Sequence, residues 1–198
     1  MKVYVYDLPP RFNIEWLSNE RCSKHLFASE VAIHRALLKS DVRTRVRTAI
    51  WRRYGGDRRF YLRRHRFAGY QSEIVRSTFC LCPLGWAPWS PRLVEAVALG
   101  CVPVIIADGI RLPFPSAVPW PEISLTVAEA DVDKLGKILE HVASTNLTSI
   151  QRNIWDPQVR RALLFHDPIL EGDATWQVLV ALSEKLDRSH RRSRVLTQ

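Results

Sequence analysis

The sequence has no long apolar segment. No run of apolar residues reaches the roughly 18 that a membrane-spanning helix needs. The chain opens with MKVYVY (residues 1–6), and the alternation of the last four residues is typical of a strand rather than of a secretion signal. The sequence as written therefore predicts neither a membrane anchor nor a signal for secretion.

Metal-binding patterns are also missing. The four cysteines include no CxxC pair, and none of the six histidines has a spacing to them that is typical of zinc sites. Cys80, Cys82 and Cys101 stand in apolar segments, and free cysteine is among the residue types most often buried. We expect these three to be packed core thiols, which leaves the redox compartment open. No metal site is expected.

One segment is almost free of acidic residues. Between Arg43 and Arg66 there are ten arginines and a single acid, Asp57, so this segment alone accounts for the net charge of +9. Such a segment indicates an anionic partner, an acidic counterpart that is missing, or a solvated surface. Because no nucleic-acid-binding motif or platform of interleaved aromatics accompanies it, we expect no nucleic-acid partner.

The chain does have the composition of a globular protein. Its 198 residues are 46% hydrophobic and 25% charged, which suits a packed core and one ordinary domain or slightly more. Strands are expected at residues 2–6, 59–62, 78–82, 102–107 and 123–127. Helices are expected at residues 23–39, 45–54, 70–77, 131–141, 145–164 and 175–186, with a proline-rich loop at 110–121 and a solvated charged tail at 188–194. The alternation from residue 59 onward predicts an α/β fold with a parallel sheet.

The most informative segment is residues 78–108, which predicts a strand, a rigid turn, a helix and a second buried strand. Ser90 suits the N-cap of the helix, Pro91 its first position, and Gly100 the position just past its end. Ligands of parallel α/β sheets bind at the carboxyl ends of the strands. The turn at residues 83–90 and Asp108 lie at this edge.

The start of this helix has two charged residues of interest. Arg92 is unfavourable to the positive end of the helix dipole, and an anion held between the guanidinium and the helix end would explain its position; the alternative is a surface arginine paired with an acid. Glu95 could accept hydrogen bonds from sugar hydroxyls, or form an ordinary helical pair with Arg92. Gly85 would allow close approach of a ligand. The turn matches neither GxGxxG nor a Walker loop.

Other residues carry weaker indications. Asp108 ends a buried strand and could face a ligand or act as a cap. Asn146 begins a glycosylation sequon, Asn-Leu-Thr, which has meaning only in the secretory pathway. Asp173 is expected near the N-cap of a helix. Trp86 and Trp89 flank the turn and could stack on a sugar or base, or pack in the core.

Several motifs together resemble the C-terminal region of exostosin-family glycosyltransferases. They are FCLCPLGW (79–86), SPRLVEA (90–96), GCVPVI (100–105) and LPF (112–114). The nearest resemblance is to the plant branch that acts in xylan synthesis, the fragile-fiber or irregular-xylem type. Residues 2–44 resemble the start of the family's catalytic region and residues 46–198 its end.

The resemblance implies a GT-B design with two Rossmann-like domains, the second of which binds a UDP-sugar. Gly85, Ser90, Arg92 and Glu95 would hold the nucleotide sugar, and Arg47 would face the diphosphate. It further implies inverting sugar transfer to a xylan-type polysaccharide, no metal or other cofactor, a Golgi location, and homologous glycosyltransferase subunits as partners. It identifies no catalytic residue.

One departure from the family pattern is large. A domain-sized block is absent between Thr44 and Arg45, and it would hold most of the acceptor domain and the first strand of the donor domain. We therefore expect residues 1–44 to be a remnant of the N-terminal domain, and residues 45–198 to be a donor domain that is incomplete at its start.

Three functions remain open at this point. The first is a UDP-sugar-dependent transferase of xylan synthesis, or a truncated form of one that lacks full turnover, since catalysis needs donor and acceptor held together. The second is a non-catalytic partner in a xylan synthase complex. The third is a polyanion-binding protein that acts through the segment from Arg43 to Arg66.

Overall fold

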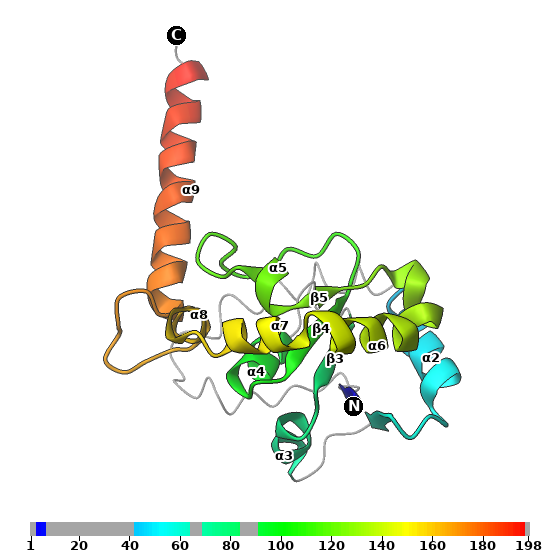
Figure 1. Ribbon diagram of the computed structural model, residues 1–198. Helices are drawn as coiled ribbons and strands as arrows, with labels where there is room; N and C mark the ends of the chain where they lie inside the picture. Colours follow the sequence, from blue (N-terminus) through cyan, green and yellow to red (C-terminus); the bar gives the residue numbers. More distant parts are fainter. Residues whose placement is uncertain (1–2, 7–41, 64–68, 84–90, 197–198) are drawn as a thin grey trace.

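A computed structural model describes residues 3–6, 42–63, 69–83 and 91–196, with side chains from 46 to 186 within these ranges (Figure 1). The strands β1 (Val3–Tyr6), β2 (Phe60–Arg63), β3 (Phe79–Pro83), β4 (Val102–Ile106) and β5 (Leu125–Thr126) form one sheet in the order β2-β1-β3-β4-β5. Every neighbouring pair is parallel. The predicted α/β fold with a parallel sheet is therefore confirmed.

The strand β1 lies inside this sheet, between β2 and β3. All four of its residues pair with β2, and Val3 and Tyr4 also pair with Phe79 and Cys80 of β3. The helix α2 (Val42–Tyr54), the first in the described part of the chain, runs without a break through the junction at Thr44 and Arg45. The division of the chain at residue 44 stays a prediction, and the helix expected at residues 23–39 lies outside the described residues.

The remaining helices differ from the predicted ones mainly at their ends. They are α3 (Tyr70–Val75), α4 (Arg92–Ala98), α5 (Trp120–Ile123), the 3₁₀ helix η2 (Glu129–Lys134), α6 (Leu135–Thr145), α7 (Leu147–Ile154), α8 (Pro157–Leu163) and α9 (Ala174–Leu196).

Two of the predicted helices were wrong in extent. The single helix expected at residues 145–164 is two, because Pro157 has no N–H for a continuing helix and Asp156 caps a new one by accepting from the Gln158 N–H at 2.8 Å. The tail expected at residues 188–194 is helical and belongs to α9, which extends away from the sheet (Figure 1). Two smaller differences follow. The helix α5 replaces the end of the loop expected at residues 110–121, and β5 has two residues where a strand was expected at 123–127.

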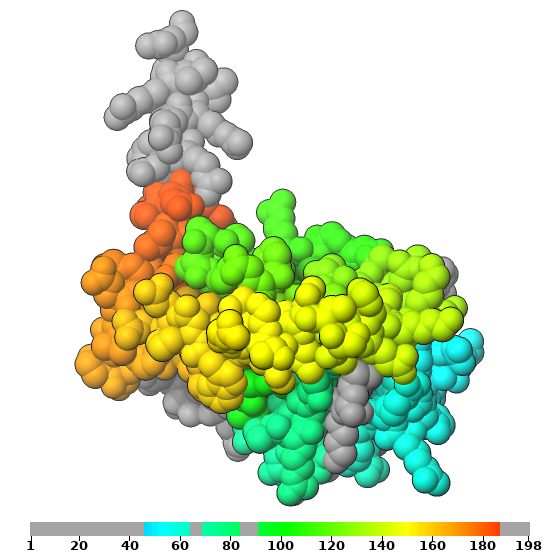
Figure 2. All heavy atoms as spheres, viewed as in Figure 1, coloured from blue at the N-terminus to red at the C-terminus, as the bar shows by residue number. Residues whose placement is uncertain are grey.

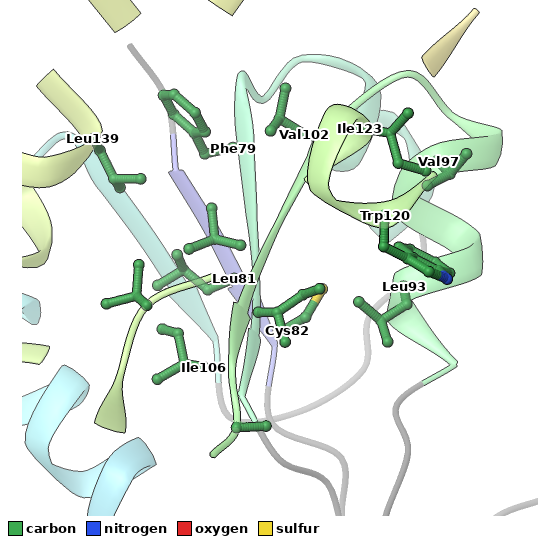
Figure 3. Close-up of a cluster of buried hydrophobic side chains, with 14 of the residues drawn as sticks. Phe79, Leu81, Cys82, Leu93, Val97, Val102, Ile106, Trp120, Ile123 and Leu139 are labelled. Carbon is green, nitrogen blue, oxygen red and sulfur yellow. The ribbon is translucent and has the colours of Figure 1, made fainter. Parts of the chain in front are cut away.

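The core lies on both faces of β3 and β4, every residue of which is buried. Successive side chains of a strand point to opposite faces. In Figure 3, Cys82 lies on the side of Leu93 and Trp120, which come from α4 and α5. Burial on both faces explains why β3 and β4 read in the sequence as continuous apolar runs.

Tyr54 fixes the end of α2 against the rest of the molecule. Its ring stacks on Phe60 at 4.3 Å, and its hydroxyl oxygen lies 3.0 and 2.9 Å from the carbonyl oxygens of Val132 and Asp133, to which it donates. The Gly136 N–H donates to the same hydroxyl at 3.2 Å. These contacts hold α2 on η2 and α6, so the charged end of α2 has a defined position.

Asp173 is the N-cap residue of α9, as the sequence predicted. Its buried carboxylate accepts from the Trp176 N–H at 2.9 Å and from the Leu170 N–H at 3.0 Å. Burial raises the pKa of this carboxyl group, but the backbone N–H donors of Trp176, Leu170 and His166 and the charge of the His166 ring outweigh it. The net pKa therefore lies below its ordinary value.

This lowered pKa makes the stability depend on pH. Asp173 stabilises the fold above the unfolded-state pKa of about 3.9, and that contribution is lost as the pH falls through the lower folded-state pKa. We expect Asp173→Asn to have a lower urea midpoint than the wild type at pH 7. Below about pH 4 the two midpoints should approach each other. Urea unfolding from pH 3 to 8 measures this, with the exposed Glu171→Gln as control; a pH-independent difference would contradict it.

Candidate functional site

The end of α4 is built by the backbone around Gly100. The Gly100 N–H donates to the Val97 carbonyl at 3.1 Å and the Cys101 N–H to the Ala96 carbonyl at 2.9 Å, which is a Schellman motif. Gly100 has φ +76°, and a Cβ atom there would lie 2.6 Å from the ring of Trp155. The predicted position of Gly100 just past the helix is confirmed, and the close approach of Trp155 adds a second reason for glycine.

A disulfide ties the same end of α4 to β3. Cys80 and Cys101 are bonded, with Cα atoms 5.9 Å apart and a sequence separation of 21. The prediction that both are free core thiols was therefore wrong. The sequence spacing gave no warning, because the β3-α4-β4 crossover brings the start of β4 back beside β3.

Cys82 is the packed core thiol that the sequence predicted. It is free and buried, and burial raises the pKa of its thiol to about 12, with the charges of Arg92 and Glu95 acting in opposite directions. The thiol is therefore protonated near neutral pH. A thiolate nucleophile is not available at this position.

Helix α8 also contacts the end of α4. Arg160 donates to the Ala98 carbonyl at 2.9 Å, and its guanidinium lies 4.5 Å from the centre of the Trp155 ring. A covalent bond, a carbonyl cap and a close aromatic contact thus hold one end of this short helix. These contacts fix the position of α4, and with it the residues at the start of the helix.

The start of α4 carries Arg92 and Glu95. The structure begins the helix at Arg92, with Pro91 as the preceding cap residue, so the helix starts one residue later than predicted. The Glu95 N–H donates to the Pro91 carbonyl at 3.1 Å. Ser90 and Gly85, as well as Trp86 and Trp89, lie outside the described residues.

Arg92 and Glu95 line one cavity, together with Tyr70, Ile74, Cys80, Leu81 and Ala96. Arg92 is only 5% exposed, so it is not the surface arginine that one reading of the sequence allowed. The Tyr70 hydroxyl donates to Glu95 Oε1 at 3.3 Å. The cavity, at about 10 Å³, has room for little more than one water molecule and is far too small for a nucleotide.

The other predicted site residues lie apart from this cavity. Arg47 is half-buried on α2. The exposed Asp108 forms a reciprocal pair with Glu129: its carboxylate accepts from the Glu129 N–H at 3.2 Å, and the Glu129 carboxylate accepts from the Asp108 N–H at 3.1 Å. This geometry is that of a cap, and a ligand role for Asp108 stays a prediction. Asn146 is exposed between α6 and α7.

Sequence reasoning missed two parts of this arrangement, Tyr70 and the disulfide. Tyr70 stands 25 residues before Glu95, and no pattern linked the two.

Within the described ranges, no group of three or more His, Cys, Asp or Glu side chains is arranged to hold a metal ion. In the same part of the chain, no helix combines the length and apolarity that crossing a bilayer requires.

By fold, the chain is an α/β protein with a small parallel sheet and a charged helix start beside the carboxyl end of a buried strand. A comparison of the sequence with models of protein families identifies its family. The model of the exostosin GT47 domain matches residues 41–142, just over half of the chain, and the chain belongs to this family.

Two curated relatives of the chain come from plants. The chain is 81% identical over 149 residues to the "Probable glucuronoxylan glucuronosyltransferase IRX7" of Arabidopsis thaliana, covering 75% of this chain and 33% of the relative. It is 53% identical over 189 residues to the "Probable glucuronosyltransferase Os03g0107900" of Oryza sativa subsp. japonica, covering 93% and 44%. The chain thus spans between a third and a half of the length of these relatives.

Proposed function

We propose that this chain is a UDP-sugar-dependent, inverting glycosyltransferase of xylan synthesis in the plant cell wall, or the donor-binding part of one. The observation that carries the proposal is the exostosin GT47 match over residues 41–142, which includes Arg92 and Glu95. The relatives named as glucuronoxylan glucuronosyltransferases support xylan as the acceptor.

In this proposal the parallel sheet is the Rossmann-like donor domain of a GT-B enzyme. Arg92 binds the diphosphate with a charge-assisted hydrogen bond, and Glu95 accepts from sugar hydroxyls. Gly85 and Ser90 complete the nucleotide-sugar site, and Arg47 approaches the diphosphate from α2. The cavity beneath Arg92 and Glu95 is not the nucleotide site. The residues that line this cavity support the two side chains, and the Tyr70 hydroxyl donates to the Glu95 carboxylate. No metal or cofactor is required, and no catalytic residue is assigned.

The proposed location is the Golgi lumen. The Cys80–Cys101 disulfide supports it, because such bonds persist in oxidising compartments and are rare in the cytosol. Asn146 is exposed, as a glycosylated asparagine must be. Cys80 and Cys101 found as reduced thiols in protein isolated from plant cells would argue against this location.

Titration calorimetry of the chain with UDP tests the proposal. Saturable binding is expected at low micromolar to millimolar concentrations, the range of ordinary enzyme substrates. Folded protein that gives no heat with UDP or with UDP-glucuronic acid would overturn it.

A second candidate is a non-catalytic partner of a homologous full-length glycosyltransferase. The family match over residues 41–142 supports this candidate equally, since no catalytic residue is assigned in the chain. This candidate predicts co-purification with a full-length homologue, and no sugar transfer by this chain alone.

A further inference from the structure

Asn146 lies at the junction of two helices on the surface of the molecule. It is the cap residue at the end of α6 and at the start of α7, and both Asn146 and Thr148 are exposed. Figure 2 shows residues 135–154 (yellow-green to yellow) across the front of the molecule, with no other segment lying over them in this view. A large group attached to Asn146 would therefore extend into solvent.

Neither of the two usual reasons for an asparagine at a helix end applies to Asn146. At a helix start, the asparagine side chain accepts from a backbone N–H of the first turn, and Asn146 makes no such bond. Past a helix end, asparagine is favoured where φ is positive, and φ here is −114°. Only the backbone of Asn146 joins the helices: its N–H donates to the Val142 carbonyl at 3.0 Å, and its carbonyl accepts from the Ile150 N–H at 3.1 Å. Capping therefore does not explain the side-chain amide.

A second asparagine nearby has a structural role instead. The Asn153 amide donates to the Glu122 carbonyl at 3.2 Å and so ties α7 to α5. Asn153 is followed two positions later by a tryptophan, which has no hydroxyl. Among the four asparagines of the sequence, at positions 13, 19, 146 and 153, only Asn146 begins the pattern Asn-X-Ser/Thr with an X other than proline.

The surface around Asn146 is polar. The exposed neighbours on the two helices include His141, Ser144, Thr145, Thr148 and Ser149. None of the large apolar side chains that are exposed in the described ranges belongs to α6 or α7, and most of them lie between Phe165 and Leu186. Contact sites for other proteins are usually marked by exposed apolar patches. A hydrophilic group at Asn146 would therefore cover no such patch.

We propose that Asn146 carries an N-linked glycan on the outer surface of α6 and α7. The proposal rests on the proposed Golgi location, because asparagines in this pattern are modified in proteins of the secretory pathway. The Cys80–Cys101 disulfide is a separate observation that favours the same kind of compartment.

The modification transfers an oligosaccharide from a polyprenyl diphosphate carrier to the asparagine. The Asn146 Nδ2 atom attacks the anomeric carbon of the first sugar and forms a C–N bond. The bond between that carbon and the diphosphate oxygen breaks, and the diphosphate leaves with the electron pair. The amide loses one proton to a base of the transferring enzyme, so nothing is oxidised or reduced. Thr148 completes the acceptor pattern, and serine would supply the same hydroxyl.

The glycan would stand apart from the proposed nucleotide site. The cavity beneath Arg92 and Glu95 is lined by residues of α3, β3 and α4 and by none of α6 or α7. Helix α2, which carries Arg47, is held by Tyr54 at η2 and at the start of α6, and Asn146 lies at the opposite end of α6. The glycan is therefore expected to leave the affinity for UDP unchanged.

Mass spectrometry of the full chain isolated from plant cells tests the proposal. Peptide N-glycosidase A in heavy-oxygen water converts a glycosylated asparagine to an aspartate that carries the label, and the tryptic peptide of residues 138–152 contains no asparagine besides Asn146. We expect this peptide to be labelled. On gels, Asn146→Gln and Thr148→Ala should migrate faster than the wild type by the mass of one glycan. Thr148→Ser and the matched control Asn153→Gln should migrate as the wild type does.

The possible outcomes separate this proposal from the proposed location and function. An unlabelled peptide in protein whose Cys80 and Cys101 are bonded would overturn the glycan and leave the location standing. An unlabelled peptide in protein with both thiols reduced would overturn the two together. Titration calorimetry of the wild type and Asn146→Gln with UDP should give equal affinities; a labelled peptide in a chain that does not bind UDP would reject the proposed function and keep the glycan.

Discussion

Removal of the Cys80–Cys101 disulfide is expected to lower the free energy of unfolding by about 3 kcal/mol. The bond closes a segment with a sequence separation of 21, and a loop of that length loses roughly this much conformational freedom in the unfolded chain. The variant Cys80→Ala/Cys101→Ala is chosen because both side chains are buried and alanine adds no unpaired polar group. Urea unfolding at pH 7 measures the difference.

The control for this prediction is reduction of the wild type. Dithiothreitol should lower the stability of the wild type toward that of the double variant, and should leave the double variant unchanged. Cys82→Ala is a second control, because it removes a buried sulfur but no cross-link. This variant should lose less stability than the double variant. Dithiothreitol should still lower its stability, because its disulfide is intact. Equal stability of oxidised and reduced wild type would show that the disulfide contributes nothing to the fold.

The disulfide also shows where sequence reasoning stops. Gly100 and Asp173 were placed correctly because a helix end is a local problem, decided by φ and by hydrogen-bond donors within a few residues. The pairing of Cys80 with Cys101 depends on where a crossover returns the chain, and that is fixed by strand pairing rather than by spacing. The same holds for Tyr70, whose contact with Glu95 comes from the packing of α3 beside α4.

The position of β1 gives a related lesson. Its alternating residues predicted a strand, and the strand exists, but alternation says nothing about its neighbours. The resemblance predicted that residues 1–44 are a remnant of the N-terminal domain and that the donor domain is incomplete at its start, and this division stays a prediction. In the structure Val3–Tyr6 pairs with β2, and Val3 and Tyr4 also pair with β3, so this strand fills an interior place in the sheet that contains the candidate site.

The burial of Arg92 makes a sharper test of the nucleotide site possible. A guanidinium that is 5% exposed contributes to stability as well as to any ligand, so loss of UDP binding in an alanine variant would not separate the two roles. Methionine has a similar length and no charge, so it fills the space of the arginine, although removal of one buried charge lowers stability when a neighbouring opposite charge stays behind. Arg92→Met therefore removes the cation without leaving a large cavity.

We expect Arg92→Met to lose up to about 4 kcal/mol in free energy of unfolding and to bind UDP about a hundredfold more weakly. The second figure corresponds to the loss of about 3 kcal/mol, an upper value for a hydrogen bond to a charged group. Calorimetry measures the affinity and urea unfolding the stability. Arg76→Met, at an exposed arginine that ends α3, removes one charge from the surface and should change neither quantity.

Glu95→Gln completes the comparison. The glutamine side chain can still accept from the Tyr70 hydroxyl, so the fold should persist, while a sugar hydroxyl loses a charged acceptor. If Arg92 served only to balance the charge of Glu95, the double variant Arg92→Met/Glu95→Gln would recover the UDP affinity that the single variants lose. If both side chains contact the nucleotide sugar, the double variant would bind more weakly than either single variant. Unchanged UDP affinity in Arg92→Met, with its fold intact, would place the nucleotide elsewhere in the chain.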